Sequence, residues 1–198
     1  MYHLKSVLCY PLLLIFNKSL SEGLFPDIWK VSSVSPIFKS GDKSNVSNYR
    51  PISKICHIAK LFESLVLPSI QKSVNHVLID EQHGFRSGRS TTTCNAIFTS
   101  YVLDAFSNRS KVDIIYTDFA KAFDHVNHKA LLQVLRATGF GEPLLSWFES
   151  YVTGRKQFVK FNGVCSSMVN ITSGVPRGGH LSPAVAVFPG RQGRQCLP

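Results

Sequence analysis

The stretch from Val112 to Leu135 constrains the fold more than any other part of this 198-residue sequence. It opens with 114–116 (Ile-Ile-Tyr), a run of β-branched and aromatic residues that is too short for a helix and predicts a buried strand. Asp118 follows that run, and Asp124 comes six residues later, where we expect it to be the N-cap of an amphipathic helix. A carboxylate at the end of a strand that turns into a helix is a common catalytic or metal-binding edge. A solvated strand end and a plain helix cap explain the same spacing, so both interpretations stay open here.

The rest of the sequence alternates helical patterns with hairpins. Helices are predicted up to Gly23, over 55–77 with Pro68 as a kink or an end, over 91–106, after Asp124, and over 144–152. Strand pairs are predicted at 31–38 with 49–53, and at 157–161 with 166–171, where Asn162-Gly163 is a strong turn signal. This order favours an α+β fold over a doubly wound parallel sheet.

The N-terminal apolar run over 7–16 follows Lys5 and has the charge and length of a signal-peptide core. No small-residue cleavage site follows it, and about ten residues cannot cross a bilayer as a helix. We therefore expect a core helix over 1–23 and no membrane partner.

The composition describes a basic globular protein. The formal net charge is +10, which favours a polyanionic partner, with nucleic acid ahead of an acidic membrane surface. The five cysteines are scattered and form no CxxC pair, which is typical of reduced thiols. We expect an intracellular protein of the cytoplasm, the nucleus or both.

No single short motif in this sequence is strong evidence for a binding site. The loops GFRSGRS and VPRGG offer backbone N–H groups and arginines to phosphates, but neither matches a P-loop or GxGxxG. His125 and His128 lie three residues apart without the glutamate of HExxH, so a solvated helix face is favoured over a metal site.

Four sequence motifs, found in a fixed order along the chain, are together specific enough to indicate a family. They are WKVSSVSPIFKSGDKSNVSNYRPIS, EQHGFRSGRSTTT, YTDFAKAFDHVNH and GVPRGGHLSP. With them the chain closely resembles the reverse transcriptase domain of non-LTR (LINE-type, jockey-like) retrotransposons over roughly residues 12–183.

This resemblance implies a right-hand polymerase fold with fingers and a partial palm, the thumb being absent. It divides the chain into a helix leading into the fingers (1–23), a partial reverse transcriptase domain (24–183) and a divergent tail expected to be disordered (184–198). The implied activity is RNA-directed DNA polymerisation, with an RNA template, a DNA primer and a dNTP as partners. The implied cofactor is Mg²⁺, held as two ions.

The resemblance also implies roles for single residues. Asp118 is the implied catalytic residue and first metal ligand, assisted by the backbone carbonyl of Phe119. The implied nucleotide-binding residues are Lys39, Arg50, Phe123 (as the gate beside the sugar) and Gly178. The implied nucleic-acid-binding residues are Arg86, Arg89 and Arg177.

These residue types suit in-line phosphoryl transfer. Two Mg²⁺ ions roughly 3.5–4 Å apart clamp the attacking and leaving oxygens, and carboxylates are their natural ligands. Lysine and arginine neutralise a triphosphate, arginine with a bidentate fork. A positive net charge suits nucleic acid and predicts binding that weakens with salt.

The sequence departs from the family at three points. No Asp or Glu follows Glu149, so the family's second block of two adjacent aspartates is missing from the last 49 residues. Asp113 cannot replace it, because a strand rises about 3.3 Å per residue and separates it from Asp118. Arg177 stands where the family usually has Gln, and Gly179 where it often has Ser.

Three hypotheses follow. The leading one is a truncated reverse transcriptase domain that is inactive as an isolated chain. The alternative is a non-enzymatic, basic nucleic-acid-binding remnant of a degenerate mobile element. A short-lived translation product of such an element is the third.

Overall fold

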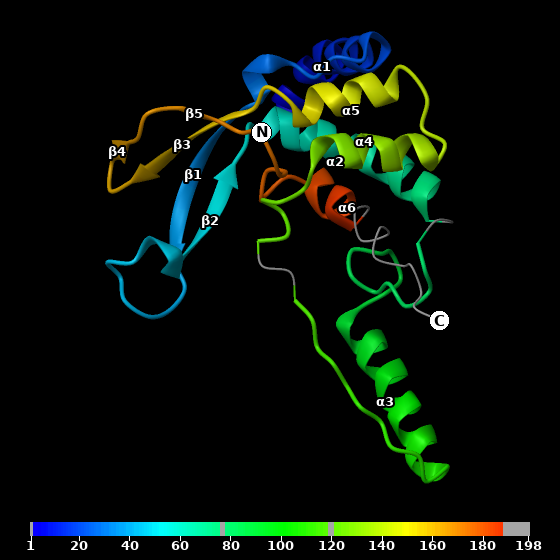
Figure 1. Ribbon diagram of the computed structural model, residues 1–198. Coiled ribbons are helices and arrows are strands. Elements are labelled where there is room, and N and C mark those ends of the chain that lie inside the picture. Colours follow the sequence, from blue (N-terminus) through cyan, green and yellow to red (C-terminus); the bar gives the residue numbers. More distant parts are fainter. Residues whose placement is uncertain (1, 76–77, 119–120, 188–198) are drawn as a thin grey trace.

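The computed structural model describes residues 2–75, 78–118 and 121–187. It is an α+β protein, as predicted. Its helices are α1 (Tyr2–Glu22), α2 (His57–Val74), α3 (Thr91–Ser107), α4 (His128–Ala137), α5 (Leu144–Val152) and α6 (Leu181–Val187). Its strands are β1 (Val31–Phe38), β2 (Tyr49–Lys54), β3 (Lys156–Phe161), β4 (Val164–Cys165) and β5 (Val169–Asn170). Figure 1 shows α1, α2, α4, α5 and α6 gathered together, with the sheet extending sideways from them.

The sheet is mixed. Its order is β2-β1-β3-β4, and β5 also pairs with β3. The predicted hairpin of β1 and β2 is antiparallel, whereas β1 and β3 run parallel over Val31–Val34. The first hairpin is therefore confirmed. The second turn is also where it was predicted, because β3 pairs antiparallel with β4 and β5, but the return strand predicted at 166–171 begins at Val164 and is split in two. At the second turn Asn162 has φ 48° and Gly163 has φ 82°, the left-handed backbone that a tight two-residue hairpin needs.

One apolar core holds α1, α2, α4, α5 and α6 together. Its centre is an aromatic cluster in which the Phe16 and Phe62 rings stack at 4.4 Å and Trp147 meets Phe62 edge to face at 5.3 Å. Leu131 and Leu135 of α4 are fully buried, which confirms the helical spacing read after Asp124. Such a core stabilises the fold mainly by removing apolar area from water.

Helix α1 forms as predicted, but it contacts the core only in part. Most of the apolar run over 7–16 is exposed, namely Val7, Leu8, Tyr10, Leu13, Leu14 and Ile15. Phe16 is buried in the core. The helix ends at Glu22 and is followed by Gly23, whose φ of 66° suits a glycine stop. Leu24 N–H donates to the Ser19 carbonyl at 3.0 Å, which closes that end. Within the part of the chain that is described, no helix is long and apolar enough to cross a membrane.

Helix α2 continues through Pro68 to Val74, so this proline does not end it. The first four residues of the tail predicted to begin at 184 are helical, because α6 runs to Val187 and Val185 is buried in the core. The boundary predicted after Pro183 therefore lies inside a helix. Residues 188–198 of that tail lie outside the described residues.

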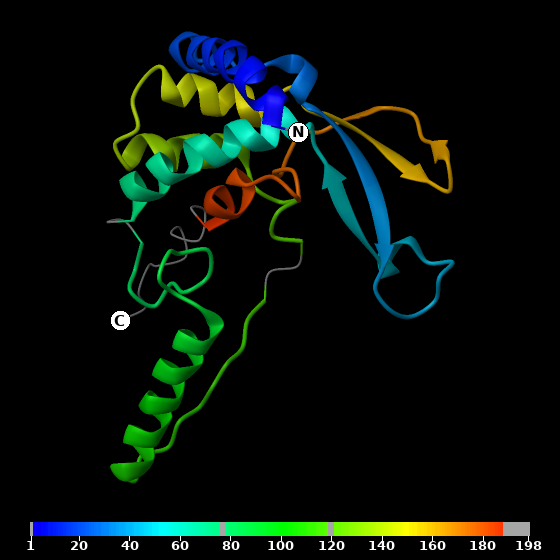
Figure 2. The ribbon, with the colours of Figure 1, turned by 180° about the vertical axis from the view of Figure 1, so that it is seen from behind.

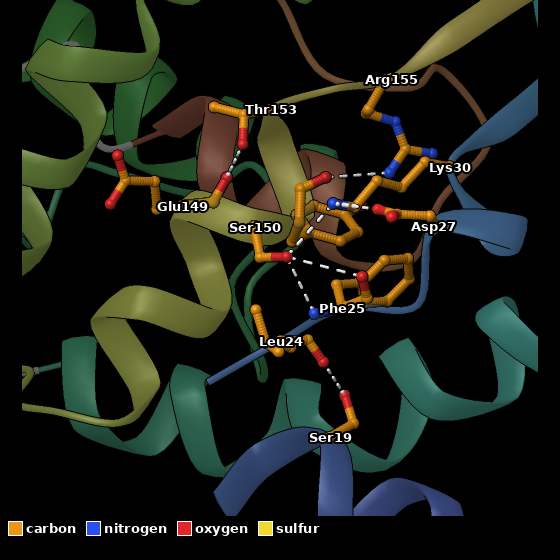
Figure 3. Close-up of polar contacts among 10 residues, drawn as sticks. Ser19, Leu24, Phe25, Asp27, Lys30, Glu149, Ser150, Thr153 and Arg155 are labelled. Carbon is orange, nitrogen blue, oxygen red and sulfur yellow. Dashed lines mark hydrogen bonds and ion pairs between the residues drawn. The ribbon is translucent and has the colours of Figure 1, made fainter. Parts of the chain in front are cut away.

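A polar junction fixes where β1 and β3 begin (Figure 3). The Ser150 hydroxyl of α5 accepts from Phe25 N–H at 3.0 Å and from the Lys30 ammonium at 3.2 Å. Lys30 also pairs with Asp27 at 2.9 Å, and its carbonyl accepts from Lys156 N–H at 3.2 Å. The same few residues thus tie the helical core to the starts of the two parallel strands.

The predicted buried strand at 114–116 is wrong. These residues are extended but pair with no strand of the described sheet, and the Ile115 and Tyr116 side chains are 88% and 83% exposed. Figures 1 and 2 show this segment running beside α3, away from the helical core. Strand propensity is realised only where a partner edge is present, and the described sheet forms elsewhere.

Candidate functional site

The site is built around the turn over 121–128, which leads into α4. Asp124 N–H donates to the Lys121 carbonyl at 2.8 Å, and Lys121 itself has a φ of 55°. The predicted N-cap at Asp124 is wrong. Asn127 caps α4 instead, its side-chain oxygen accepting from Ala130 N–H at 3.1 Å. The helix begins three residues later than predicted, which frees the Asp124 carboxylate for another contact.

That contact is a two-pronged ion pair with Arg177. The guanidinium Nε lies 3.1 Å from Asp124 Oδ1, and Nη2 lies 2.7 Å from Oδ2. The two side chains are partly exposed, at 23% for Arg177 and 40% for Asp124. Planar guanidinium and carboxylate groups match in this geometry, so the pair fixes orientation as well as distance.

Backbone bonds join the same turn to the loop over 173–179. Gly174 N–H donates to the Val126 carbonyl at 2.9 Å, and Val175 N–H donates to the Phe123 carbonyl at 2.9 Å. His128 Nε2 lies 2.8 Å from the Gly174 carbonyl oxygen, consistent with a donated hydrogen bond. Residues almost fifty positions apart are thereby held as one unit.

Two glycines make this close approach possible. A Cβ on Gly174 would lie 2.7 Å from the Phe123 carbonyl, and one on Gly178 would lie 2.6 Å from the Ser53 carbonyl. Their φ values of 82° and 124° also favour glycine. Ser53 N–H of β2 donates to the Arg177 carbonyl at 2.9 Å, so the loop reaches the β1–β2 hairpin as well.

A buried carboxylate holds the other end of this loop. Glu63 of α2 is fully buried and accepts from Leu181 N–H at 3.2 Å and from the Tyr151 hydroxyl at 3.0 Å. Burial raises the pKa of the Glu63 carboxyl above its ordinary value, and the two donated hydrogen bonds oppose that rise. A Cβ on Gly179 would lie 2.7 Å from Glu63 Oε2, so glycine is needed here too.

Arg155 lies beside this buried group. Its guanidinium is 5.2 Å from the Tyr151 ring centroid and donates to the Tyr151 carbonyl at 3.0 Å. Burial lowers the pKa of Arg155 and raises that of the Tyr151 hydroxyl. Arg155 Nε is the one buried side-chain polar atom of the described residues that lacks a hydrogen-bond partner.

The predicted site residues fall into separate groups. Phe123, Arg177 and Gly178 belong to the linked turn and loop, with Phe123 partly buried against the core. Lys39 and Arg50 lie diagonally across the hairpin, because Lys39 N–H donates to the Asn48 carbonyl and Arg50 pairs with Ile37.

The remaining predicted residues lie apart from that turn and loop. Arg86 and Arg89 approach Asp80 at 3.8 and 3.6 Å in the segment before α3. Asp118 ends the exposed segment beside α3, and Phe119 lies outside the described residues. No described contact joins Asp118 to the linked turn and loop.

The donor set does not fit a two-metal site. Within residues 2–75, 78–118 and 121–187, no group of three His, Cys, Asp or Glu side chains could hold a metal ion. His125 and His128 do not form such a group, and His128 contacts the Gly174 carbonyl instead.

Sequence reasoning missed Glu63, Tyr151 and Arg155. One signal for Glu63 was present: it lies on the helix face that also carries Phe62, Val66 and Ile70, which are buried. A carboxylate on an apolar helix face predicts a buried polar contact. Nothing local to Tyr151 or Arg155 distinguishes them, because their partners come from distant parts of the chain.

Most of the chain is similar in sequence to known proteins. Residues 39–188 match the family described as reverse transcriptase (RNA-dependent DNA polymerase). The chain is 31% identical over 175 residues to the probable RNA-directed DNA polymerase from transposon BS of Drosophila melanogaster, covering 87% of the chain and 19% of that relative. It is 32% identical over 177 residues to the RNA-directed DNA polymerase from mobile element jockey of the same species, covering 88% of the chain and 19% of that relative. The chain thus spans about a fifth of the length of these curated relatives, and it belongs to the reverse transcriptase family, with non-LTR retrotransposon polymerases as its relatives.

Proposed function

We propose that this chain is the fingers and part of the palm of an RNA-directed DNA polymerase from a non-LTR retrotransposon. The family match over 39–188 and the relatedness to the jockey polymerase support this assignment. The proposed partners are an RNA template, a DNA primer and a dNTP.

The observation that carries the proposal is the union of the 121–128 turn with the 173–179 loop. The resemblance implies that both segments lie around the incoming nucleotide, and in this chain the Asp124–Arg177 pair and two backbone hydrogen bonds join them. Phe123 and Gly178 are the residues of this unit that we assign to the nucleotide. The glycines of the loop let it pack directly against the Phe123 and Ser53 carbonyls, which holds Phe123 and Gly178 in one unit.

Lys39 and Arg50 are proposed to hold the triphosphate. They lie diagonally across the same hairpin, so both cations can approach one polyanion. Arg86 and Arg89 are assigned to the template strand.

Asp118 is proposed as one ligand for Mg²⁺, which would stabilise charge on the transferring phosphoryl group. Within the described residues Asp118 belongs to no group of three His, Cys, Asp or Glu side chains that could hold a metal ion, and the sequence has no Asp or Glu after Glu149. We therefore derive no catalytic step through the metal and expect the isolated chain not to extend a primer.

The experiment grafts residues 39–183 into the jockey polymerase in place of the equivalent segment. Primer extension on an RNA template with Mg²⁺ is measured for this chimera, for its Asp118→Asn variant and for the matched control Asp113→Asn. Extension by the chimera and the control, but not by Asp118→Asn, is the expected result.

Two results would contradict the proposal. One is equal extension by the chimera and its Asp118→Asn variant. The other is a folded chimera that extends no primer. The isolated 198-residue chain is assayed in parallel, and extension above the level of its own Asp118→Asn variant would show that the missing carboxylates are not needed.

A further inference from the structure

Arg177 contacts two parts of the candidate site that come from distant segments. Its carbonyl accepts from Ser53 N–H of β2 at 2.9 Å, and its guanidinium forms the two-pronged pair with Asp124. Strand β2 belongs to the hairpin that we assign to the triphosphate. Asp124 directly follows Phe123, which we assign to the sugar. Arg177 therefore lies between two groups that must act on the same nucleotide.

The backbone of Phe123 is held by the loop over 173–179. Its carbonyl accepts from Val175 N–H at 2.9 Å, and the Asp124 carbonyl accepts from the Ser173 hydroxyl at 3.1 Å. A Cβ on Gly174 would lie 2.7 Å from the Phe123 carbonyl oxygen and 2.8 Å from that of Asp124. The Phe123 side chain is partly buried and packs against the core. The position of the Phe123 ring thus depends on the position of this loop.

The Asp124–Arg177 pair links the same turn to the end of the loop that reaches β2. Nε and Nη2 of the guanidinium lie 3.1 and 2.7 Å from the two carboxylate oxygens. Two parallel hydrogen bonds restrain rotation as well as distance, which a point charge does not. The backbone beside Arg177 is fixed too, because a Cβ on Gly178 would lie 2.6 Å from the Ser53 carbonyl. Phe123 and the hairpin are thereby held at a set spacing.

The exposure of the pair argues against a main role in folding. Asp124 is 40% exposed and Arg177 is 23% exposed, so water screens their attraction and the pair adds little to the stability of the fold. Geometry is more sensitive than stability here, because moving a positioned group by about 1 Å can change a rate about 100-fold.

Discrimination at the sugar needs a wall that does not yield. A ribonucleotide differs from a deoxyribonucleotide by one 2′ hydroxyl, and an apolar site rejects an added hydroxyl by about 100-fold at most. An aromatic ring supplies that rejection by volume only while its surroundings keep it in place. A ring that can move aside would accept both sugars.

We propose that the Asp124–Arg177 pair determines sugar specificity, because it holds Phe123 at a fixed spacing from the β1–β2 hairpin. Both residues act through Phe123 and are positioning residues. This inference rests on the proposed function, which supplies the roles of Phe123 and of the hairpin. Glutamine, usual in the family at the position of Arg177, has no guanidinium fork, so the two-pronged contact belongs to this chain.

The test uses the full 198-residue chain with dCTP and CTP, which differ only at the 2′ position. Saturation-transfer difference NMR, without added metal, measures the dissociation constant of each nucleotide, and the ratio of the two constants is the readout. Asp124→Asn and Arg177→Met break the pair separately, and the double variant removes both partners. The matched controls are Glu22→Gln and Lys18→Met, which break an exposed ion pair of α1 with the same changes of charge.

Wild type is expected to bind dCTP at least about tenfold more tightly than CTP. Each single change should reduce that preference to less than about threefold, and the double variant should reduce it no further, because the two residues act as a unit. Loss of the Arg177 charge weakens both nucleotides and cancels in the ratio. Arg177→Lys should also lose the preference, since it keeps the charge without the fork. Phe123→Ala should match the broken pair, and the controls should match wild type.

A second measurement asks whether the pair holds the turn. Exchange of the Val175 amide, which donates to the Phe123 carbonyl, should be at least about fivefold faster in Asp124→Asn and unchanged in Glu22→Gln. The fluorescence of buried Trp147 should be the same in all variants, which guards against a folding defect.

Several results would overturn the proposal. They are a wild-type chain that binds both nucleotides equally or binds neither, single effects that add in the double variant, and exchange of the Val175 amide that ignores loss of the pair. Failure of the polymerase chimera is a separate result. It would count against the proposed activity, whereas a 2′ preference of the 198-residue chain that depends on the pair would still support this inference.

Discussion

At the scale of single residues, Glu63 and Asp124 are carboxylates that hold opposite ends of one loop. Asp124 meets Arg177 at the partly exposed end, and Glu63 meets Leu181 N–H in the core. Because their surroundings differ, the two carboxylates should contribute differently to the free energy of unfolding. An ion pair near water is screened, whereas burial of a carboxylate imposes a desolvation cost.

Glu63→Gln tests the buried group through pH. Because the folded-state pKa of Glu63 lies above its ordinary value of 4.5, the folded chain binds this proton more tightly than the unfolded chain. Its contribution to the free energy of unfolding is therefore full below pH 4.5 and is lost as pH rises through the folded pKa. Each unit by which the pKa is raised corresponds to about 1.4 kcal/mol.

We expect Glu63→Gln to gain stability relative to wild type across this window. Urea unfolding at a series of pH values measures the difference. The control is Glu149→Gln, at an exposed position. Its free energy of unfolding should depend on pH in the same way as that of wild type. A constant difference between Glu63→Gln and wild type at all pH values would contradict the assignment.

A double-mutant cycle tests the Asp124–Arg177 pair. Asp124→Asn, Arg177→Gln and the double variant should give a coupling of about 0.5–1 kcal/mol, reduced by the partial exposure of both groups. The control cycle uses Lys18 and Glu22, two exposed residues of α1 whose charged groups lie 3.8 Å apart. Their coupling energy should be less than about 0.5 kcal/mol. Equal couplings in the two cycles would mean that the two-pronged geometry adds nothing.

At the scale of elements, α4 and the segment over 112–118 show how far local patterns reach. Helix α4 has apolar residues at helical spacing and a core to pack against, so its pattern becomes a buried stripe. The 112–118 segment has strong strand propensity but no partner in the described sheet, so it stays exposed.

Paired alanine substitutions test this contrast. Ile115→Ala should change the free energy of unfolding by less than about 0.5 kcal/mol, because its side chain is 88% exposed. Leu131→Ala should cost about 2–5 kcal/mol, because Leu131 is fully buried and leaves a cavity. Urea unfolding measures both. A cost above about 1.5 kcal/mol for Ile115→Ala would contradict its exposed placement and support a buried strand at 114–116.

At the scale of the whole molecule, α3 stands outside the single core. None of its described side chains is buried, and its apolar residues include Tyr101 and Phe106, exposed by 67% and 62%. Ser90 caps the helix by accepting from Thr93 N–H. A helix of this length without packing is marginal in water, so α3 should melt independently of the core.

Thermal unfolding should therefore show two events. Far-UV circular dichroism should begin to fall before the fluorescence of Trp29 and Trp147, which are buried in the core. Ser90→Ala should enlarge the early loss without moving the fluorescence midpoint, because it removes about 1 kcal/mol of capping from α3 alone. Asn95→Ala, an exposed position in the same helix, is the control. Coincident transitions would show that α3 is coupled to the core.

Much of the fold follows from short-range patterns. The Asn162-Gly163 turn, the Ser90 cap and the Leu131–Leu135 stripe are local, because each depends on residues within a few positions. Asp124 was misassigned because Asn127 competes with it as a cap and Arg177, 53 positions away, offers a second partner. The placement of Asp118 remains a prediction, because no described contact joins it to the rest of the site.

The sequence by itself determined the family, the hairpins and the helices, because ordered motifs and periodicity are properties of neighbouring residues. Only the tertiary structure decided which strand propensities become strands, which side chain caps α4, and which arginine meets Asp124. Those outcomes depend on contacts between distant segments, such as Glu63 with Leu181 and Asp124 with Arg177. Pairing and burial select among local preferences that the chain leaves nearly equal in energy.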